Sequence, residues 1–241
     1  MQEIEEVAKL GVQINIDNIS ILEQFGHHYP NIPVCIRINP HIMAGGNHKI
    51  SVGHIDSKFG ISIHQVPLIK RVIENTGMRI NGIHTHTGSD ILDIDVFLSA
   101  TEIILNTAKD FKDLEFIDLG SGFKVPYREG DISTNIEELG ERLSKRFNKF
   151  CKEYGKELTL MFEPGKFLVS EAGSFLAHVN VVKQTTSTVF LVGGSSVETA
   201  LGMNWTEAEI LKSTGSWPKI KPAEKLLVVS GSCSPITANQ I

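Results

Sequence analysis

The sequence predicts an α/β fold in which short strands alternate with helices around a parallel sheet. Up to about residue 175, short β-branched runs alternate with amphipathic stretches, which is typical of repeated strand–helix units. In the clearest amphipathic stretch, apolar residues recur at three- and four-residue intervals, the period of a helix with one buried face. After about residue 176 this alternation ends.

Five runs are predicted as strands, and each is followed by a helix or by a loop leading into one. About five strand–helix units therefore follow a first helix, which is predicted at residues 2 to 10. The five runs are VQINID (12 to 17), VCIRIN (34 to 39), INGIHTHT (80 to 87), LEFIDL (114 to 119) and LTLMFE (158 to 163).

The clearest predicted helix covers residues 135 to 154. Thr134 or Asn135 can cap its start, and Gly155 can end it. Two similar apolar stripes predict helices at about residues 66 to 76 and 97 to 108.

Beyond residue 176 the predicted elements follow a different pattern. Residues 177 to 190 are predicted as one long strand, 214 to 225 as a linker with Pro and Lys, and LLVVS (226 to 230) as a buried strand. Ser234 can cap a helix with Pro235 at its first position, so we expect the sequence to stop one turn into a helix.

Composition argues against several classes of protein. A net charge of −5 without a Lys/Arg stripe disfavours nucleic-acid binding. No apolar run approaches the roughly 20 residues of a membrane span, and the acidic start does not resemble a signal peptide, so we expect a cytoplasmic protein. The scattered Cys35, Cys151 and Cys233 predict buried free thiols.

Polar residues gather where the predicted strands end. In a parallel sheet these carboxyl ends meet at one rim, so the residues are predicted to share a site. They are Asp17, then Arg37 and Asn39, then His84, His86 and Ser89, then Asp118 with Gly120, Ser121 and Gly122, then Glu163 with Pro164, Gly165 and Lys166.

Two kinds of ligand suit such a rim. A metal ion could bind His84 and His86 with Asp118 or Glu163 as a further ligand, as in a metal-dependent barrel hydrolase, although a structural histidine pair explains His84 and His86 equally well.

A phosphorylated aromatic cofactor explains more of these residues. The Gly120–Ser121–Gly122 amides, the Ser89 hydroxyl and Lys166 suit a phosphate. Glu163 can keep a pyridine nitrogen protonated, and His86 can lie against the ring face.

Several motifs resemble those of the alanine-racemase-like barrel decarboxylases that depend on pyridoxal phosphate. Their sequences are most similar to those of diaminopimelate decarboxylase. The resemblance covers about residues 1 to 190 and implies a partial (βα)8 TIM-type barrel, about the last five strand–helix units, over residues 1–175. A strand at 176–190 would lead toward a β domain. The motifs are IRINP, HIDSKFGI, GIHTHTGSD, IDLGSGF and EPGKFLVSEAG.

The resemblance also implies roles for residues. His86 would stack on the cofactor ring, Ser89 and the loop of Gly120, Ser121 and Gly122 would hold its phosphate, and Glu163 would pair with the ring nitrogen. Gly165 and Lys166 would close the phosphate or substrate-carboxylate side, while Arg37 and Lys58 would support the ring-hydroxyl side. Lys166 and Ser121 stand where the family more often has arginine and glycine.

The family forms a Schiff base between the cofactor and a lysine in a motif like YAVKAN, which these 241 residues do not contain. We therefore expect a decarboxylase fragment with little or no turnover by itself. Its exposed sheet edges predict a homo-oligomer or a partner chain that completes the barrel. A non-catalytic interaction or structural fragment is the other alternative.

The last fifty residues resemble a second family. FLVGGSSVETAL and LLVVSGSCSPITANQI are similar to the start of the nucleotide-binding domain of four-carbon acid sugar kinases. Residues 191–241 would then form a short α/β tail with a phosphate-binding turn near Ser230 to Ser234. A plain strand–turn–helix is the simpler interpretation, and a fusion, a truncation or a design would each produce such a junction.

Overall fold

The protein consists of two compact units. The computed structural model divides the chain into a first unit, Met1–Lys124 with Ser133–Pro164, and a second unit, Val125–Ile132 with Gly165–Ile241. The structure describes residues 2–42, 57–126, 130–170 and 172, and the backbone of residues 174–184, 189–193, 207–211 and 226–230.

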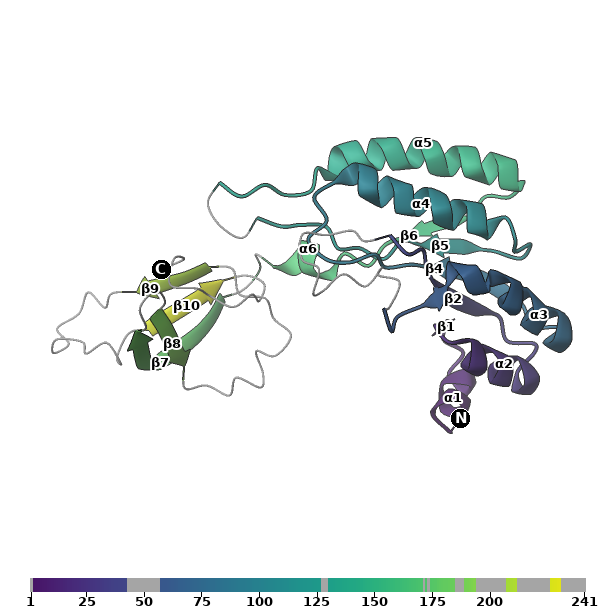
Figure 1. Ribbon diagram of the computed structural model, residues 1–241, viewed down its shortest axis with the longest axis horizontal. Helices are drawn as coiled ribbons and strands as arrows, with labels where there is room; N and C mark the ends of the chain where they lie inside the picture. The colour runs from purple at the N-terminus through teal and green to yellow at the C-terminus, as the bar shows by residue number, and fades with distance from the viewer. Residues whose placement is uncertain are drawn as a thin grey trace. The chain divides into compact units, whose positions relative to one another are not determined.

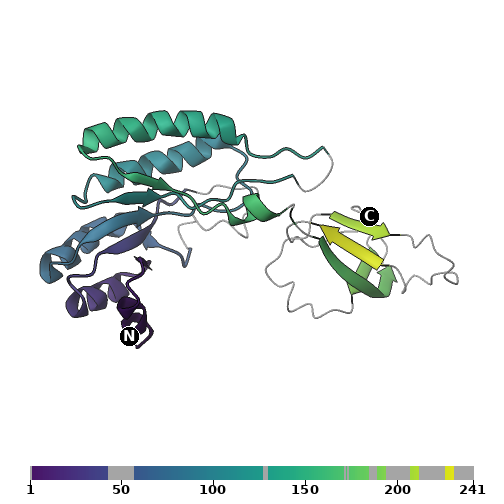
Figure 2. The ribbon, with the colours of Figure 1, turned by 180° about the vertical axis from the view of Figure 1, so that it is seen from behind.

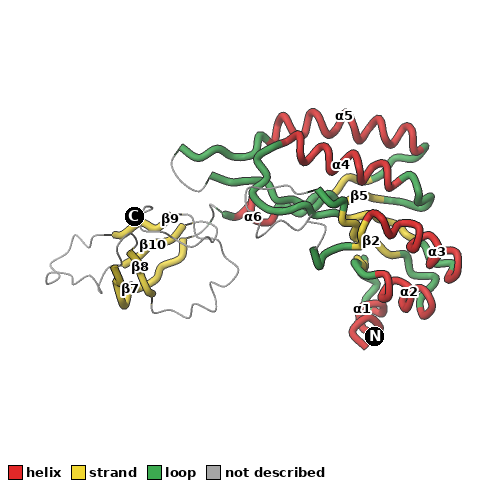
Figure 3. The backbone as a smooth tube through the Cα atoms, in the orientation of Figure 1, coloured by secondary structure: helices red, strands yellow, loops and turns green. Residues whose placement is uncertain are grey.

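The first unit is a parallel sheet whose strands alternate with helices along the chain (Figures 1 and 3). A short 3₁₀ turn at Ile63–Gln65 leads into the third helix. The helices are α1 (Gln2–Lys9), α2 (Ile19–His28), α3 (Val66–Thr76), α4 (Ile94–Ala108) and α5 (Ile136–Tyr154), and the strands are β1 (Ile14–Ile16), β2 (Val34–Asn39), β3 (Ile61–Ser62), β4 (Ile80–His84), β5 (Phe116–Asp118) and β6 (Thr159–Met161).

The strands lie in the order β1-β2-β4-β5-β6, all parallel, and β3 pairs with the end of β2. Because parallel crossovers are right-handed, strands added in this order place their connecting helices on one face. Two views show α4 and α5 side by side along the sheet (Figures 1 and 2). This is the arrangement of a partial TIM-type barrel, which confirms the predicted fold class.

The core lies between the sheet and its helices. Apolar side chains of the middle strands pack there against those of the helices, and burial of each such side chain contributes about 1.5–3 kcal/mol. Side chains that are less than 2% exposed include Ile36, Ile38, Ile83, Ile117, Leu22, Phe25, Ile69 and Ile104.

Local signals set the helix ends. The Asn135 side chain accepts a hydrogen bond from the Glu138 N–H and begins α5, and Gly155 ends it in the left-handed conformation (φ 82°). Asp93, which was not predicted as a cap, accepts from the amides of Asp95 and Val96 at the start of α4. No described helix combines the length and apolarity needed to cross a membrane.

The described part of the second unit contains a short helix, α6 (Gly165–Val169), and an antiparallel sheet of order β8-β7-β10-β9. Its strand β10 coincides with the predicted LLVVS strand. The single long strand predicted at 177 to 190 is wrong, because β7 and β8 are separate strands that pair antiparallel. The strands are β7 (Ser174–Gln184), β8 (Val189–Gly193), β9 (Glu207–Leu211) and β10 (Leu226–Ser230).

Two further predictions meet the structure only in part. Cys35 is a buried free thiol as predicted, and burial raises its pKa, whereas Cys151 is free but partly exposed. The predicted helix start at Ser234, like Cys233, lies outside the described residues. The likeness of residues 191–241 to a sugar kinase stays a prediction.

Candidate functional site

Neighbouring strands bring their last residues to one level at the carboxyl edge of the sheet. Arg37 on β2 pairs in register with His84 on β4, and His84 pairs with Asp118 on β5. Asp118 pairs in turn with Met161 at the end of β6, two residues before Glu163. The polar residues predicted to share a site therefore start from one edge, here called the rim: Arg37, His84, His86, Ser89, Asp118, Gly120, Ser121, Gly122 and Glu163.

The loop after β5 lies directly against His86. Ser121 N–H donates to Nδ1 of His86 at 3.3 Å. Gly120 has a φ of 62°, and a Cβ there would lie 2.6 Å from the Thr85 carbonyl oxygen and 2.8 Å from His86 Nδ1. Only a glycine at this position lets the loop approach the imidazole so closely.

The same loop also contacts the loop that follows β4. A Cβ on Gly122, whose φ is 109°, would lie 2.0 Å from the Gly88 carbonyl oxygen. The Ile91 N–H donates to the Gly122 carbonyl oxygen at 2.8 Å. These contacts bring Ser89, the residue after Gly88, into the neighbourhood of the glycine loop.

Two of the three loop amides are already used inside the protein. Gly120 N–H donates to Oδ1 of Asp118 at 2.8 Å, and Ser121 N–H donates to His86. Among the described residues, the Gly122 N–H and the hydroxyls of Ser89 and Ser121 have no hydrogen-bond partner. An anion at this loop would therefore have one amide and two hydroxyls as donors, fewer amides than the sequence suggested.

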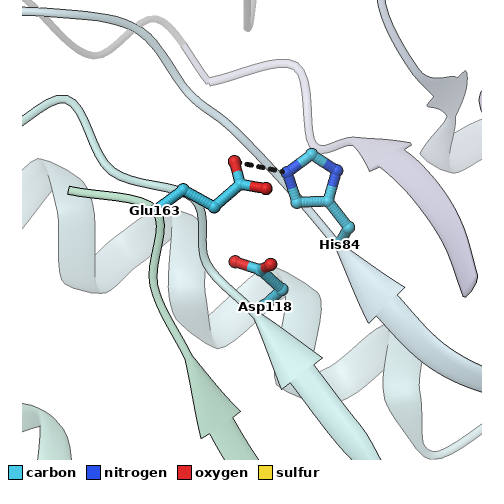
Figure 4. A group of neighbouring side chains, drawn as sticks. All are labelled: His84, Asp118 and Glu163. Atoms are coloured by element: carbon cyan, nitrogen blue, oxygen red, sulfur yellow. Dashed lines mark ion pairs between the residues drawn. The ribbon is translucent and has the colours of Figure 1, made fainter. Parts of the chain in front are cut away.

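His84, Asp118 and Glu163 form a compact group at the centre of the rim (Figure 4). Nε2 of His84 lies 3.5 Å from Oε2 of Glu163, and its Nδ1 lies 2.8 Å from Nδ2 of Asn15 on β1. His84 and Asp118 are buried, whereas the Glu163 side chain is 55% exposed. The sequence did not point to Asn15, because its role depends on a contact between strands 69 residues apart.

Burial sets the protonation of these groups. It lowers the pKa of His84 to about 4, against the opposing effect of Asp118, and it lowers the pKa of His86, with Arg37 acting in the same direction. Burial and the neighbouring Asp118 carboxylate raise the pKa of Glu163. At neutral pH the two imidazoles are neutral, so His86 offers an uncharged ring face.

Arg37 lies beside the group and is half-buried. Its guanidinium lies 5.0 Å from the ring centre of Phe59, and Nζ of Lys58 lies 5.2 Å from the same ring. Burial lowers the pKa of Arg37, while the carboxylates of Asp17 and Glu163 favour its charge. Arg37 and Lys58, the two residues predicted for the ring-hydroxyl side of a cofactor, therefore both lie against the Phe59 ring.

Gly165 and Lys166 begin α6 in the second unit. The predicted contact of these residues with the rim stays a prediction.

The structure does not bring both predicted metal-ligating histidines into one group. The described residues that could jointly hold a metal are His84, Asp118 and Glu163, whose ligand atoms lie within 4.8 Å of one another. His86 is not among them, and its Nδ1 accepts from Ser121. A hydrolase site built on both histidines therefore lacks one of its ligands in this arrangement.

The family model for the pyridoxal-dependent decarboxylase, pyridoxal binding domain, matches residues 1–170. The chain belongs to this family. The resemblance of the barrel motifs to these decarboxylases is thereby confirmed, and the barrel that carries the rim is a pyridoxal-binding domain.

Curated relatives within the family are diaminopimelate decarboxylases. That of Methanothermobacter thermautotrophicus is 31% identical over 190 residues, which cover 76% of this chain and 44% of that protein. That of Escherichia coli K12 is 28% identical over 189 residues, which cover 78% and 45%. The chain thus spans about half the length of the curated relatives it matches.

Solved structures show the same fold. A crystal structure of diaminopimelate decarboxylase has a TM-score of 0.75 at 24% identity and covers 97% of this chain and 65% of its own. The Helicobacter pylori diaminopimelate decarboxylase, complexed with L-lysine, has a TM-score of 0.72 at 22% identity and covers 96% and 66%.

Proposed function

We propose that the rim binds pyridoxal phosphate and that the chain is the cofactor-binding part of a diaminopimelate decarboxylase. This enzyme would convert meso-diaminopimelate to lysine and carbon dioxide, a step of lysine biosynthesis in the cytoplasm. The convergence of His86, the Gly120–Gly122 loop and Glu163 at one rim carries the proposal. The family match and the diaminopimelate decarboxylases among the relatives support it.

The donors left at the glycine loop suit a phosphate. The Gly122 N–H and the hydroxyls of Ser89 and Ser121 would hold it, and their lack of other partners among the described residues supports this role. Gly165 and Lys166 would close the phosphate or substrate-carboxylate side, with Lys166 providing charge.

The groups at the ring side suit a pyridinium. Neutral His86 would lie against the ring face, and Glu163, with its raised pKa, would hold the proton at the ring nitrogen. Arg37 and Lys58, which share Phe59, would support the ring-hydroxyl side. When bound, pyridoxal phosphate supplies a ring that accepts the electron pair left as carbon dioxide departs from the substrate.

The substrate would be a small amino acid. The diaminopimelate decarboxylases from Helicobacter pylori and M. jannaschii were crystallised with L-lysine, the product of the proposed reaction. Since the 241 residues contain no YAVKAN-like lysine motif, we propose that this chain by itself binds the cofactor without a covalent link and has little or no turnover.

Titration with pyridoxal phosphate, followed by absorbance, tests the proposal. We expect saturable binding that weakens about tenfold in Glu163→Gln, because a neutral amide oxygen accepts more weakly from a pyridinium N–H than a carboxylate does. Glu157→Gln changes an exposed glutamate just before the amino end of β6, so it should bind like the wild type. Equal affinities in the wild type and Glu163→Gln, or no saturable binding, would contradict the proposal.

Borohydride reduction followed by peptide mass spectrometry tests the covalent link. We expect no cofactor adduct on a specific lysine, and one stable, stoichiometric adduct would contradict noncovalent binding. Mixing the chain with a lysine-bearing chain tests the alternative that it is an interaction fragment. Under that alternative, decarboxylation should occur in the mixture and in neither chain alone.

The grouping of His84, Asp118 and Glu163 favours metal-dependent hydrolysis as the second candidate. Stoichiometric zinc in the purified protein, lost together with a hydrolytic activity on chelation, would support that candidate over the decarboxylase.

A further inference from the structure

His84 contacts Asn15 on β1 and Glu163, which lies two residues after the end of β6. Its ring lies at the end of β4, with Nδ1 at 2.8 Å from Asn15 on β1 and Nε2 at 3.5 Å from Glu163 beyond β6. The residue is 5% exposed, and Nε2 has no hydrogen-bond partner among the described residues. Figure 4 shows this nitrogen directed at the Glu163 carboxylate.

The chemistry of its two neighbours assigns the ring proton. An ionised carboxylate can only accept hydrogen bonds, whereas an asparagine amide can donate or accept. The neutral imidazole of His84 has one N–H, so that N–H belongs on Nε2, facing Glu163. Nδ1 then accepts from the amide of Asn15.

We infer that His84 is a positioning residue that directs its Nε2–H at Oε2 of Glu163 and thereby leaves Oε1 to accept a hydrogen bond from the protonated nitrogen of a cofactor ring. This inference rests on the proposed function for the identity of that ring. The distance of 3.5 Å exceeds the usual length of about 2.9 Å, and such contacts commonly shorten once the ligand is in place.

A neutral donor is suited to this task. Arg37 and Asp118 already provide one positive and one negative charge from the strands on either side of β4, and His86 follows on the same chain segment. A cation at position 84 would weaken the proton affinity of Glu163, which must hold a proton at the ring nitrogen. An uncharged N–H orients the carboxylate with little loss of basicity.

The tautomer of His84 is the first test, made on the cofactor-free chain. Long-range ¹H–¹⁵N NMR correlation identifies which ring nitrogen carries the proton. We expect the proton on Nε2 at neutral pH. A proton on Nδ1 would overturn the inference whether or not the cofactor binds.

The second test measures the ring nitrogen of pyridoxal phosphate labelled with ¹⁵N. In the wild type its chemical shift should be that of a protonated pyridinium. In His84→Leu it should move toward the unprotonated value, and the affinity should fall about tenfold. His84→Gln can place an amide N–H near the position that Nε2 of His84 occupies in the wild type. It should restore both the chemical shift and the affinity.

Asn81→Leu is the matched control. Asn81 lies near the other end of β4 and exchanges hydrogen bonds with Gln13, as His84 contacts Asn15. This variant removes a buried polar contact of the same strand without touching Glu163, so the ring shift should stay at the wild-type value. An unchanged shift in His84→Leu, or an equal change in Asn81→Leu, would overturn the inference. A wild-type chain that binds no cofactor would overturn the proposed function instead, while the tautomer still decides the position of the proton.

Discussion

Gly122 has no room for a side chain, and its backbone conformation also favours glycine. We predict that Gly122→Ala lowers the free energy of unfolding by about 3 kcal/mol or more, because strain at a φ of 109° adds to a clash with the Gly88 carbonyl oxygen. Gly155→Ala is the control, with a φ of 82° but open space around its Cβ, and should lose only about 1 kcal/mol. Urea unfolding measures both, and equal losses would contradict the close contact between the two loops.

His84 makes stability depend on pH. Its pKa is about 4 in the folded chain and near 6.5 when unfolded, so between these values the unfolded chain binds more protons. The free energy of unfolding should therefore fall as the pH drops, by about 2 kcal/mol more in the wild type than in His84→Gln between pH 7 and pH 5. Urea unfolding of both proteins at the two pH values measures this difference. Parallel losses in the two proteins would show that His84 is not buried in its neutral form.

The N-terminal cap of α5 illustrates what short-range sequence patterns can predict. Asn135→Ala should lower the free energy of unfolding by about 1 kcal/mol, because the Glu138 N–H loses its acceptor. Asn148→Ala, an exposed position inside the same helix, should raise it by a few tenths of a kcal/mol through helix propensity. Thermal unfolding compares the two variants. An Asn135→Ala variant as stable as the wild type would argue against the cap.

Thr134, the alternative cap in the sequence, has a different role. Its hydroxyl donates to the Ile91 carbonyl oxygen at 2.6 Å and accepts from the Lys124 N–H at 2.7 Å. The sequence could not show which of Thr134 and Asn135 caps the helix, because the partners of Thr134 lie in loops 10 and 43 residues away along the chain.

Strands could be predicted where burial or alternation is unambiguous. VCIRIN is almost wholly buried, and β2 covers all six residues. INGIHTHT extends past β4, because His86 and Thr87 continue the alternation after the chain has left the sheet. The run from 177 to 190 concealed the break between β7 and β8, since it contains neither glycine nor proline to mark one.

The rim itself could be predicted because parallel strands necessarily bring their carboxyl ends together. What the sequence could not provide is the internal hydrogen bonding, such as Gly120 N–H to Asp118 or Asn15 to His84, since these contacts depend on strand register and loop packing. Motif patterns identify the residues at the rim, and the fold decides which of their donors remain for a ligand.

In the described part of the first unit, β6 is an edge strand of the parallel sheet. Within the described residues, β6 pairs only with β5, and its last residue, Met161, is 42% exposed. Unpaired edge strands promote association, and a lysine on the edge opposes it. We propose that the chain forms a homo-oligomer or binds a partner chain through this edge.

Sedimentation velocity over a range of concentrations tests that proposal. The wild type should associate, and Met161→Lys should shift the distribution toward monomer, because the new charge would have to be buried in a paired edge. Leu68→Lys provides the matched control, since Leu68 on α3 is 41% exposed and lies on a helix rather than an edge strand. Association that survives Met161→Lys unchanged, or that is equally weakened by Leu68→Lys, would place the interface elsewhere on the molecule.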